Sequence, residues 1–260
     1  MAAPSTTARR LENNRSVQVL ARVGNLAIGL LHILIGVIAL AVAAGGGGRA
    51  DQSGALQALV GVPGGLFVVW LVIAGLIALA VWQILQTVIA HTLGRRILEI
   101  AKGVVYLVLA VIAISVASGN GRNSSSSEKS SSAKLLAVPG GAILLGVIGL
   151  AIVGVGVGFL VNGIINRFER GLRLPPNRLA GVTTTLGRIG YISKGVALII
   201  VGGLVVTSAI TSDPGKSGGL DGSLKALVQL PFGVVLLILI ALGLIAYGVF
   251  WCVRAFAVRL

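Results

Sequence analysis

Six long apolar runs, separated by short polar segments, constrain this chain more than any other feature. They lie at about 24–44, 64–90, 103–118, 139–165, 189–210 and 232–253. A helix rises 1.5 Å per residue, so runs of this length cross the roughly 30 Å hydrocarbon core of a bilayer. We expect Ile97–Lys102 to lengthen the short third run by continuing its helix. The pattern therefore predicts an all-α membrane protein with six transmembrane helices.

Composition supports this class of protein. The chain is 56% hydrophobic and only 11% charged, whereas about a quarter of the residues in soluble domains are charged. The net charge of +14 would favour nucleic acid only if the basic residues formed a polar face. They lie instead in short segments between apolar runs, so no nucleic-acid partner is predicted.

The apolar runs form three copies of one unit, of which Gly187–Arg259 is the clearest. Each copy has small residues early in its first run and a proline at the entry to its second run. The small residues are Gly29, Gly103 and Gly195, followed seven residues later by Gly36, Ala110 and Gly202; the prolines are Pro63, Pro139 and Pro231. Proline suits the first turn of a helix, where its missing N–H is not needed. The sequence therefore predicts three pseudo-repeated helical hairpins.

These units divide the chain into an N-terminal tail, three hairpin repeats and one linker. The tail covers 1–22, the repeats cover 23–92, 93–168 and 187–260, and the linker covers 169–186. A segment before each proline has helical apolar spacing, near 55–59, 133–137 and 223–230, and predicts a short amphipathic helix on the outer membrane surface. The serine-rich tract 123–132 is a low-complexity polar sequence and predicts a flexible, outward-facing linker.

Lysine and arginine positions predict the orientation. Most of the 21 basic residues lie in the N-terminal tail, in the 91–102 and 166–194 connections and at the C-terminus. Basic residues gather on the cytoplasmic side of membrane proteins, so both termini are expected in the cytoplasm. The first apolar run exceeds the 7–15 residues of a signal-peptide core, and we interpret it as a retained span.

Polar side chains within or beside the spans are the candidates for function. Five polar residues are candidates, either as lining of a path along the pseudo-three-fold axis or as isolated polar groups: His32, Tyr106, Gln86, Asn162 and Arg254. An ionisable residue inside a membrane often serves a proton relay or a ligand, but a neutral histidine bonded to a neighbouring helix is an equally simple interpretation. Gln86, Asn162 and Arg254 occupy equivalent repeat positions, which fits either a ring around an axis or three independent helix ends.

Two lysines precede the repeated glycines, and Ile28 takes that place in the first repeat. Lys102 and Lys194 are candidates for contact with anionic lipid head groups, although long lysine stems also extend to the interface without a ligand. Glu99 lies one helical turn before Lys102, where the two side chains are expected to pair.

Glycines are assigned to helix packing. Gly29, Gly103, Gly195, Gly36 and Gly202, with the small-residue series Gly154, Gly156 and Gly158, let helix backbones approach closely in a membrane. All seven acidic residues lie outside the apolar cores, and Cys252 is the single cysteine. No catalytic residue, cofactor-binding residue or metal ligand is predicted, and the protein is expected not to be an enzyme.

Taken together, the repeated Lys-Gly starts, the Pro-Gly entries and the closing sequence at 241–248, Ala-Leu-Gly-Leu-Ile-Ala-Tyr-Gly, resemble a bacterial membrane family. This is the family that carries the domain of unknown function (DUF) 1206, in which a two-span unit repeats three times. The resemblance covers about 20–257. It implies six spans and a location in the bacterial plasma membrane, and it implies no activity.

Two functions are open at this point. One is a non-enzymatic protein of envelope organisation, or a subunit of a membrane assembly, with the lipid bilayer, anionic lipids at the cytoplasmic face and another membrane protein as partners. The alternative is a transporter or channel for a small solute or a lipid, using the pseudo-three-fold axis. An axial cavity that holds His32 and Tyr106 would favour transport.

Overall fold

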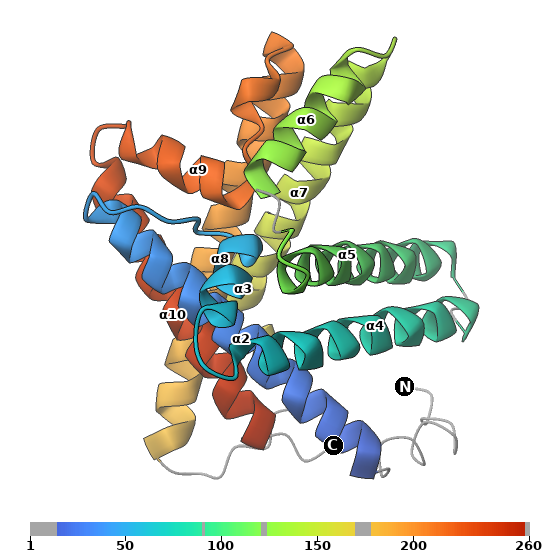
Figure 1. Ribbon diagram of the computed structural model, residues 1–260, viewed down its shortest axis with the longest axis vertical. Coiled ribbons are helices and arrows are strands. Elements are labelled where there is room, and N and C mark those ends of the chain that lie inside the picture. Colours follow the sequence, from blue (N-terminus) through green and yellow to red (C-terminus); the bar gives the residue numbers. More distant parts are fainter. Residues whose placement is uncertain (1–14, 90–91, 121–123, 170–177, 258–260) are drawn as a thin grey trace.

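The computed structural model describes residues 15–89, 92–120, 124–169 and 178–257, and within them it contains helices and no strand. Six helices are long: α2 (Arg15–Ala43), α4 (Gly65–Ile89), α5 (Leu93–Ala117), α7 (Gly141–Ile164), α8 (Arg178–Thr211) and α10 (Gly233–Ala257) (Figure 1). Three are short: α3 (Gln52–Val60), α6 (Ser124–Leu136) and α9 (Gly219–Val228). Two 3₁₀ turns, η1 (Arg167–Glu169) and η2 (Pro214–Lys216), complete the described chain. The all-α class is thereby confirmed.

Five of the long helices contain a segment long and apolar enough to cross a membrane: Gly24–Ala43, Glu99–Ala117, Gly141–Ile164, Ala180–Thr211 and Gly233–Phe256. The described part of α4 contributes a shorter apolar stretch, Gly65–Val81. Large apolar side chains point outward from these helices, including Phe67 at 69% exposure and Ile143 at 75%. Extended apolar surface of this kind is unsuited to water and is compatible with a multi-pass membrane protein.

Tight pairing joins the long helices of successive repeats. α4 packs along α5, α7 packs along α8, and α10 packs along α2, so the last repeat returns to the first. Within one repeat, α8 and α10 are packed together, whereas α2 touches α4 only lightly. Among the described residues, α5 does not pack along α7. Of the hairpins expected from the sequence, only the third is therefore a packed pair of helices.

The repeated small residues lie at these inter-repeat contacts. A Cβ atom at Gly36 would stand 2.7 Å from the carbonyl oxygen of Ala241, so α2 and α10 touch through their backbones. In the α7–α8 pair, a Cβ atom at Gly195 would be 2.7 Å from the Gly156 carbonyl oxygen. Gly29 likewise faces α10 and Gly202 faces α7, while Gly103 has more room against α4. Close backbone approach therefore stabilises the α2–α10 and α7–α8 pairs, because lipid provides no hydrophobic drive between helices.

The proline entries form turns and not the first helical turns predicted above. At the first entry, the N–H of Gly65 donates to the carbonyl oxygen of Val62 at 2.9 Å, and Gly64 between them has φ +77°. Proline followed by a residue with positive φ is the signature of a type II turn. The other two entries repeat this geometry, but Phe232 takes the positive-φ position in the third, with φ +60°.

The serine-rich tract is helical in the structure, which overturns the flexible linker predicted for it. It forms most of α6, in which Ser132 is buried. Serine is a weak helix former, so local propensity alone does not explain this helix. α6 packs against α7 of its own repeat and against η2 and α9 of the third repeat, and these tertiary contacts stabilise it.

Candidate functional site

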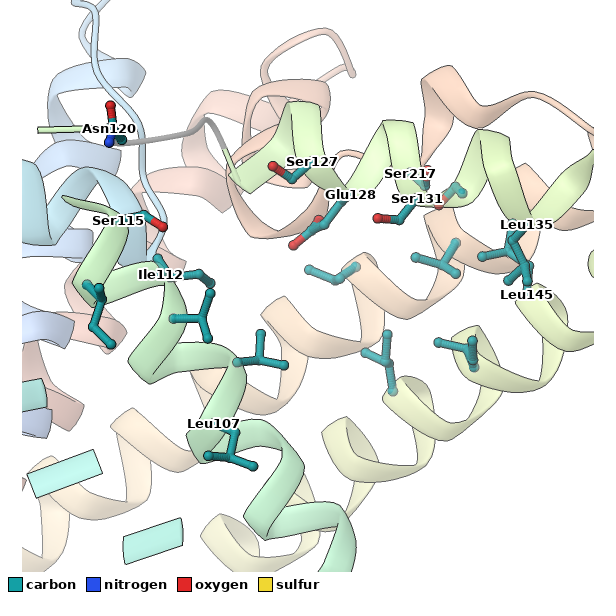
Figure 2. Close-up of a pocket in the computed structure, with 18 of the residues that line it drawn as sticks. Leu107, Ile112, Ser115, Asn120, Ser127, Glu128, Ser131, Leu135, Leu145 and Ser217 are labelled. Atoms are coloured by element: carbon teal, nitrogen blue, oxygen red, sulfur yellow. The ribbon is translucent and has the colours of Figure 1, made fainter. Parts of the chain in front are cut away.

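A cleft of about 1140 Å³ lies between α5 on one side and α7 and α8 on the other, with α6 across one end (Figure 2). It exists because α4 and α5 project away from the remaining long helices, as Figure 1 shows, and α5 has no packing contact along α7 in the described chain. The cleft is therefore a consequence of how the helix pairs are arranged.

The lining of the cleft has two parts. The larger part is apolar and comes mainly from spans α5, α7 and α8: Leu107, Val108, Val111, Ile112, Ile114, Leu145, Ile148, Ile152, Val201 and Val205, with Leu135 of α6. The polar part gathers beneath and around α6: Ser115, Ser118, Asn120, Ser127, Glu128, Ser131, Ser132 and Ser217. An apolar region along the spans with a hydroxyl-rich region at one end matches an amphiphile, which has an apolar tail and a polar head group.

Glu128 is the one charged side chain among the described residues that line the cleft. Figure 2 shows its carboxylate directed from α6 into the cleft. On its other side the carboxylate lies so close to Gly219 that a Cβ atom there would overlap it, and Gly219 also has φ +57°. Burial and, to a lesser extent, the carboxylate of Asp51 raise the pKa of Glu128 to about 7.

Asp51 provides a second negative group near this end of the cleft. It is 2% exposed and caps α3, its Oδ1 accepting from Ser53 Oγ at 2.7 Å and from the Gly54 N–H at 2.8 Å. Its Oδ2 is buried and has no hydrogen-bond partner among the described residues. The capping hydrogen bonds therefore satisfy only one of the two carboxylate oxygens of Asp51.

Asp221 of α9 differs because its charge is balanced. Lys225 donates to its Oδ2 at 2.9 Å, and the N–H of Ala50 donates to its Oδ1 at 2.9 Å. Three acidic residues, one from each repeat, thus gather around the short helices. Sequence reasoning noted that they lie outside the spans and missed their convergence. The available signal was one acidic residue about ten to twelve positions before each repeated proline.

A separate polar cluster lies among the long helices around Lys194. Its Nζ lies 3.1 Å from His32 Nε2 and donates to the Tyr247 hydroxyl at 3.4 Å. The same Nζ stands over the rings of Tyr247 and Phe159, at 4.4 Å and 4.9 Å from their centroids. Lys194 therefore lies in an aromatic cage, and its contact with a lipid head group stays a prediction.

His32 is neutral in this geometry. Its Nδ1 lies 2.8 Å from the carbonyl oxygen of Ile28, which can only accept, so Nδ1 carries the proton and donates. Nε2 is then free to accept from the Lys194 ammonium. The contact with Lys194 of α8 is of the kind expected for a histidine bonded to a neighbouring helix, and a role in a proton relay or in ligand contact stays a prediction.

Lys102 occupies the same repeat position as Lys194 and has different surroundings. Its Nζ is 3.0 Å from Glu99 Oε1, as expected from their spacing, and Gln83 Nε2 also donates to Glu99. One repeat thus balances its lysine with a carboxylate, whereas another surrounds it with aromatic rings.

The remaining candidates do not line the cleft. His32, Tyr106, Asn162 and Arg254 are all absent from its described lining, so this cavity is not the axial path considered above. Asn162 Oδ1 is buried without a partner in the described structure, and Arg254 lies over the Trp251 ring at 4.9 Å. The side chain of Gln86 lies outside the described part of the chain.

The long apolar helices, which occur in three sequence repeats, are compatible with a multi-pass membrane protein. The family model described as Domain of Unknown Function (DUF1206) matches at 23–90, 99–166 and 189–257, and the chain belongs to this family. The resemblance seen in the sequence is thus confirmed.

Two further comparisons complete this assignment. The chain is 33% identical over 247 residues to "Uncharacterized protein YxxB" of Bacillus subtilis (strain 168), covering 88% of this chain and 86% of that relative. No solved structure gives a significant match.

Proposed function

We propose that this protein is a non-enzymatic, six-span protein of the bacterial plasma membrane that binds an amphiphile in the cleft between α5 and α7–α8. The observation that carries the proposal is the two-part lining, apolar along the spans and hydroxyl-rich beneath α6. A volume of about 1140 Å³ slightly exceeds the roughly 300–1,000 Å³ of ordinary ligand pockets. It suits a lipid-sized molecule better than a small solute.

In this proposal α4 is the sixth span, because its 25 residues reach across a bilayer even though only its first part is described in full. The lysine and arginine bias places both termini in the cytoplasm. α3, α6 and α9 then lie on the outer side, and the polar end of the cleft lies at the level of the outer head groups.

The chemistry of the lining favours binding over reaction. Several serines are present, and Glu128 is the one described lining group that could remove a proton from a hydroxyl. No described serine donates a hydrogen bond to its carboxylate, and an unactivated hydroxyl is a weak nucleophile. The apolar base offers acyl chains the same environment as the bilayer. A bound amphiphile would allow this protein to act in envelope organisation or to present that molecule to a membrane partner.

Lipid occupancy tests the proposal. After purification in mild detergent, we expect native mass spectrometry to detect about one retained lipid per chain. Ile148→Trp fills the cleft from α7 and should remove most of that lipid. Ile143→Trp is the matched control, because Ile143 is on the same helix, is 75% exposed and does not line the cleft. Equal lipid retention by the two variants would contradict the proposal.

A transporter is the second candidate, and the His32–Lys194–Tyr247 cluster is the observation that favours it, because ionisable groups among spans often serve transport. Reconstituted liposomes test this function directly. Flux of a solute or a fluorescent lipid that His32→Ala abolishes would establish transport, whereas unchanged flux in that variant would remove this cluster from consideration.

A further inference from the structure

We propose that the cleft selects amphiphiles whose head group carries a primary amine, and that Glu128 receives this amine. This inference rests on the proposed lipid-binding function and adds the chemical class of the ligand.

The first support is the position and isolation of the Glu128 carboxylate. It is directed into the cleft, it is the one charge among the described lining residues, and it makes no ion pair with another described residue. Glu128 is exposed as a residue, and its carboxylate, which lies against the backbone of Gly219, gains from a partner of opposite charge or from hydrogen-bond donors. The neighbouring serines provide hydroxyls but no positive charge.

The second support is Asp51, which carries another unsatisfied carboxylate oxygen. Its Oδ2 is buried without a partner, and its charge acts on Glu128. Asp51 is buried and does not line the cleft, so its charge acts on Glu128 from outside the lining, and a cation beside Glu128 relieves the repulsion between the two carboxylates. Asp221 does not compete for that cation, because Lys225 already balances it.

The choice of a primary amine follows from geometry and charge. An ammonium group offers three N–H donors, enough for Glu128 and a nearby serine hydroxyl together. The described residues contain no group of three or more His, Cys, Asp or Glu side chains that could hold a metal ion, which favours an organic cation. An anionic head group alone would face repulsion from Glu128, whereas the serines around it can donate to the phosphate of a zwitterionic lipid.

The charged groups around Glu128 define the pH at which this recognition operates. Asp51 faces it from the start of α3, and the balanced Asp221–Lys225 pair lies on α9. Lys129, its neighbour on α6, is directed toward Gly218, with its Cε 3.6 Å from where a Cβ of that residue would lie. Because the pKa of Glu128 is raised to about 7, the ionised fraction of the carboxylate increases as the pH rises through neutrality. Amine binding should therefore strengthen between about pH 6 and pH 8.

Competition among lipids with identical acyl chains tests the inference. The delipidated full chain is titrated at pH 8 with phosphatidylethanolamine, phosphatidylcholine and phosphatidylglycerol, and bound lipid is measured by native mass spectrometry. We expect phosphatidylethanolamine to bind roughly tenfold more tightly than the other two, because only its head group pairs with the carboxylate through N–H donors. Glycerophosphoethanolamine, which has no acyl chains, should bind far more weakly than any of the lipids.

Glu128→Gln is the decisive variant. It should bind all three lipids with affinities within about twofold of one another, while still retaining lipid. Asp213→Asn is the matched control, since Asp213 is exposed, lies outside the cleft lining and precedes η2; it should leave the preference unchanged.

The possible outcomes separate the two proposals. A preference for the amine lipid that survives in Glu128→Gln, or a wild-type preference for phosphatidylglycerol, overturns the assignment of Glu128 and leaves lipid binding intact. Absence of any bound lipid in wild type and variant alike overturns the proposed function itself. Equal binding of glycerophosphoethanolamine and the intact lipid would show that the apolar lining of the cleft does not contribute to binding, and would also overturn the proposed function.

Discussion

Glu128 is a carboxyl group held where ionisation is unfavourable. Gly219 shields one side of it and the Asp51 charge acts on it, so the folded protein keeps a proton on Glu128 that the unfolded chain releases near pH 4.5. Between these two pKa values the folded state binds more protons than the unfolded state. Stability therefore falls as the pH rises through this window.

The direction of this pH dependence gives a prediction for the protein without ligand. The thermal midpoint of the wild type in detergent should decline from pH 5 to pH 7.5, and Glu128→Gln should decline less over the same range. Differential scanning fluorimetry measures both. Parallel curves for the two proteins would show that Glu128 does not titrate in this range.

Lys194 makes contacts through its stem and its ammonium that can be separated by substitution. Lys194→Met keeps an apolar chain against Phe159 and Tyr247 and removes the charge, and replacing a buried charged group by an apolar one of similar size is often close to neutral. Tyr247→Ala removes a ring that is 2% exposed and should lower the free energy of unfolding by about 3–5 kcal/mol.

Unfolding in mixed micelles of increasing SDS content measures both changes. We expect Lys194→Met to remain within about 1.5 kcal/mol of the wild type. A loss as large as that of Tyr247→Ala would instead show that the ammonium group itself holds α2, α8 and α10 together.

Lys102 and Lys194 show which residue contacts can be predicted from a sequence. The Lys102–Glu99 pair was predictable because both side chains lie on one helix face, one turn apart. The Lys194–His32 contact was not, because the two residues are 162 positions apart and their helices meet only through tertiary packing. The Glu128–Asp51 proximity was missed for the same reason.

Among the elements, helix α7 contains both glycines that pack against a neighbouring helix and glycines that have no neighbour within the described chain. Gly156 meets the backbone of α8, with Gly195 O 2.9 Å from where its Cβ would be, whereas Gly154 has open space around it. Gly156→Leu should therefore separate α7 from α8 and cost about 1–3 kcal/mol or more. Gly154→Leu, the control on the same helix, should be close to neutral. Thermal stability in detergent distinguishes them, and equal losses would argue against the packing described.

The third proline turn contains strain that the first two avoid. Phe232 has φ +60° and is 88% exposed, and a non-glycine residue in this region is disfavoured by about 1–2 kcal/mol. Phe232→Gly should raise the free energy of unfolding by roughly 0.5–1 kcal/mol, after the extra chain entropy of glycine is deducted. Phe232→Ala retains the strain and should show no gain; if it stabilises the protein equally, the strain is not the cause.

Element existence was largely predictable and element pairing was not. Length and apolar composition determine where long helices occur, so α5 and α7 were found from the sequence, with ends within a few residues except where polar lead-ins extend a helix. A face of small residues does not identify the helix that packs against it, because such a face can pack equally well against a helix of the same repeat or of the next repeat. α6 escaped prediction because its helicity depends on α9 and η2.

For the whole molecule, the proposed six-span topology makes a labelling prediction. Cys252 is the single cysteine, so Cys252→Ala provides a background without thiols. A cysteine introduced at Gly46, in the α2–α3 connection, should react with a membrane-impermeant maleimide in intact cells. A cysteine introduced at Thr92, between α4 and α5, should react only after the membrane is permeabilised, because the basic segment beside it is cytoplasmic. The reverse pattern would invert the topology.

The cleft could not be predicted from the sequence because it lies where α5, in the part of the chain that the structure describes, does not pack along α7. The sequence suggested a central path on a pseudo-three-fold axis, and the structure has a lateral cavity where the α4–α5 pair projects away from α7 and α8. Such departures from symmetry depend on the balance of many weak contacts between helices, which repeat spacing does not report.

The pairing of α10 with α2 has a consequence for biosynthesis. α2 ends at Ala43 and α10 ends at Ala257, so the partner of α2 leaves the ribosome about 210 residues after it. At about 5–20 residues per second, the first helix waits on the order of ten to forty seconds for it. During that interval the glycine face of α2 is available to lipids, to other nascent membrane proteins and to insertion chaperones. Truncation anywhere before α10 leaves that face permanently uncovered, so an interrupted chain would present a recognisable signal to membrane proteases.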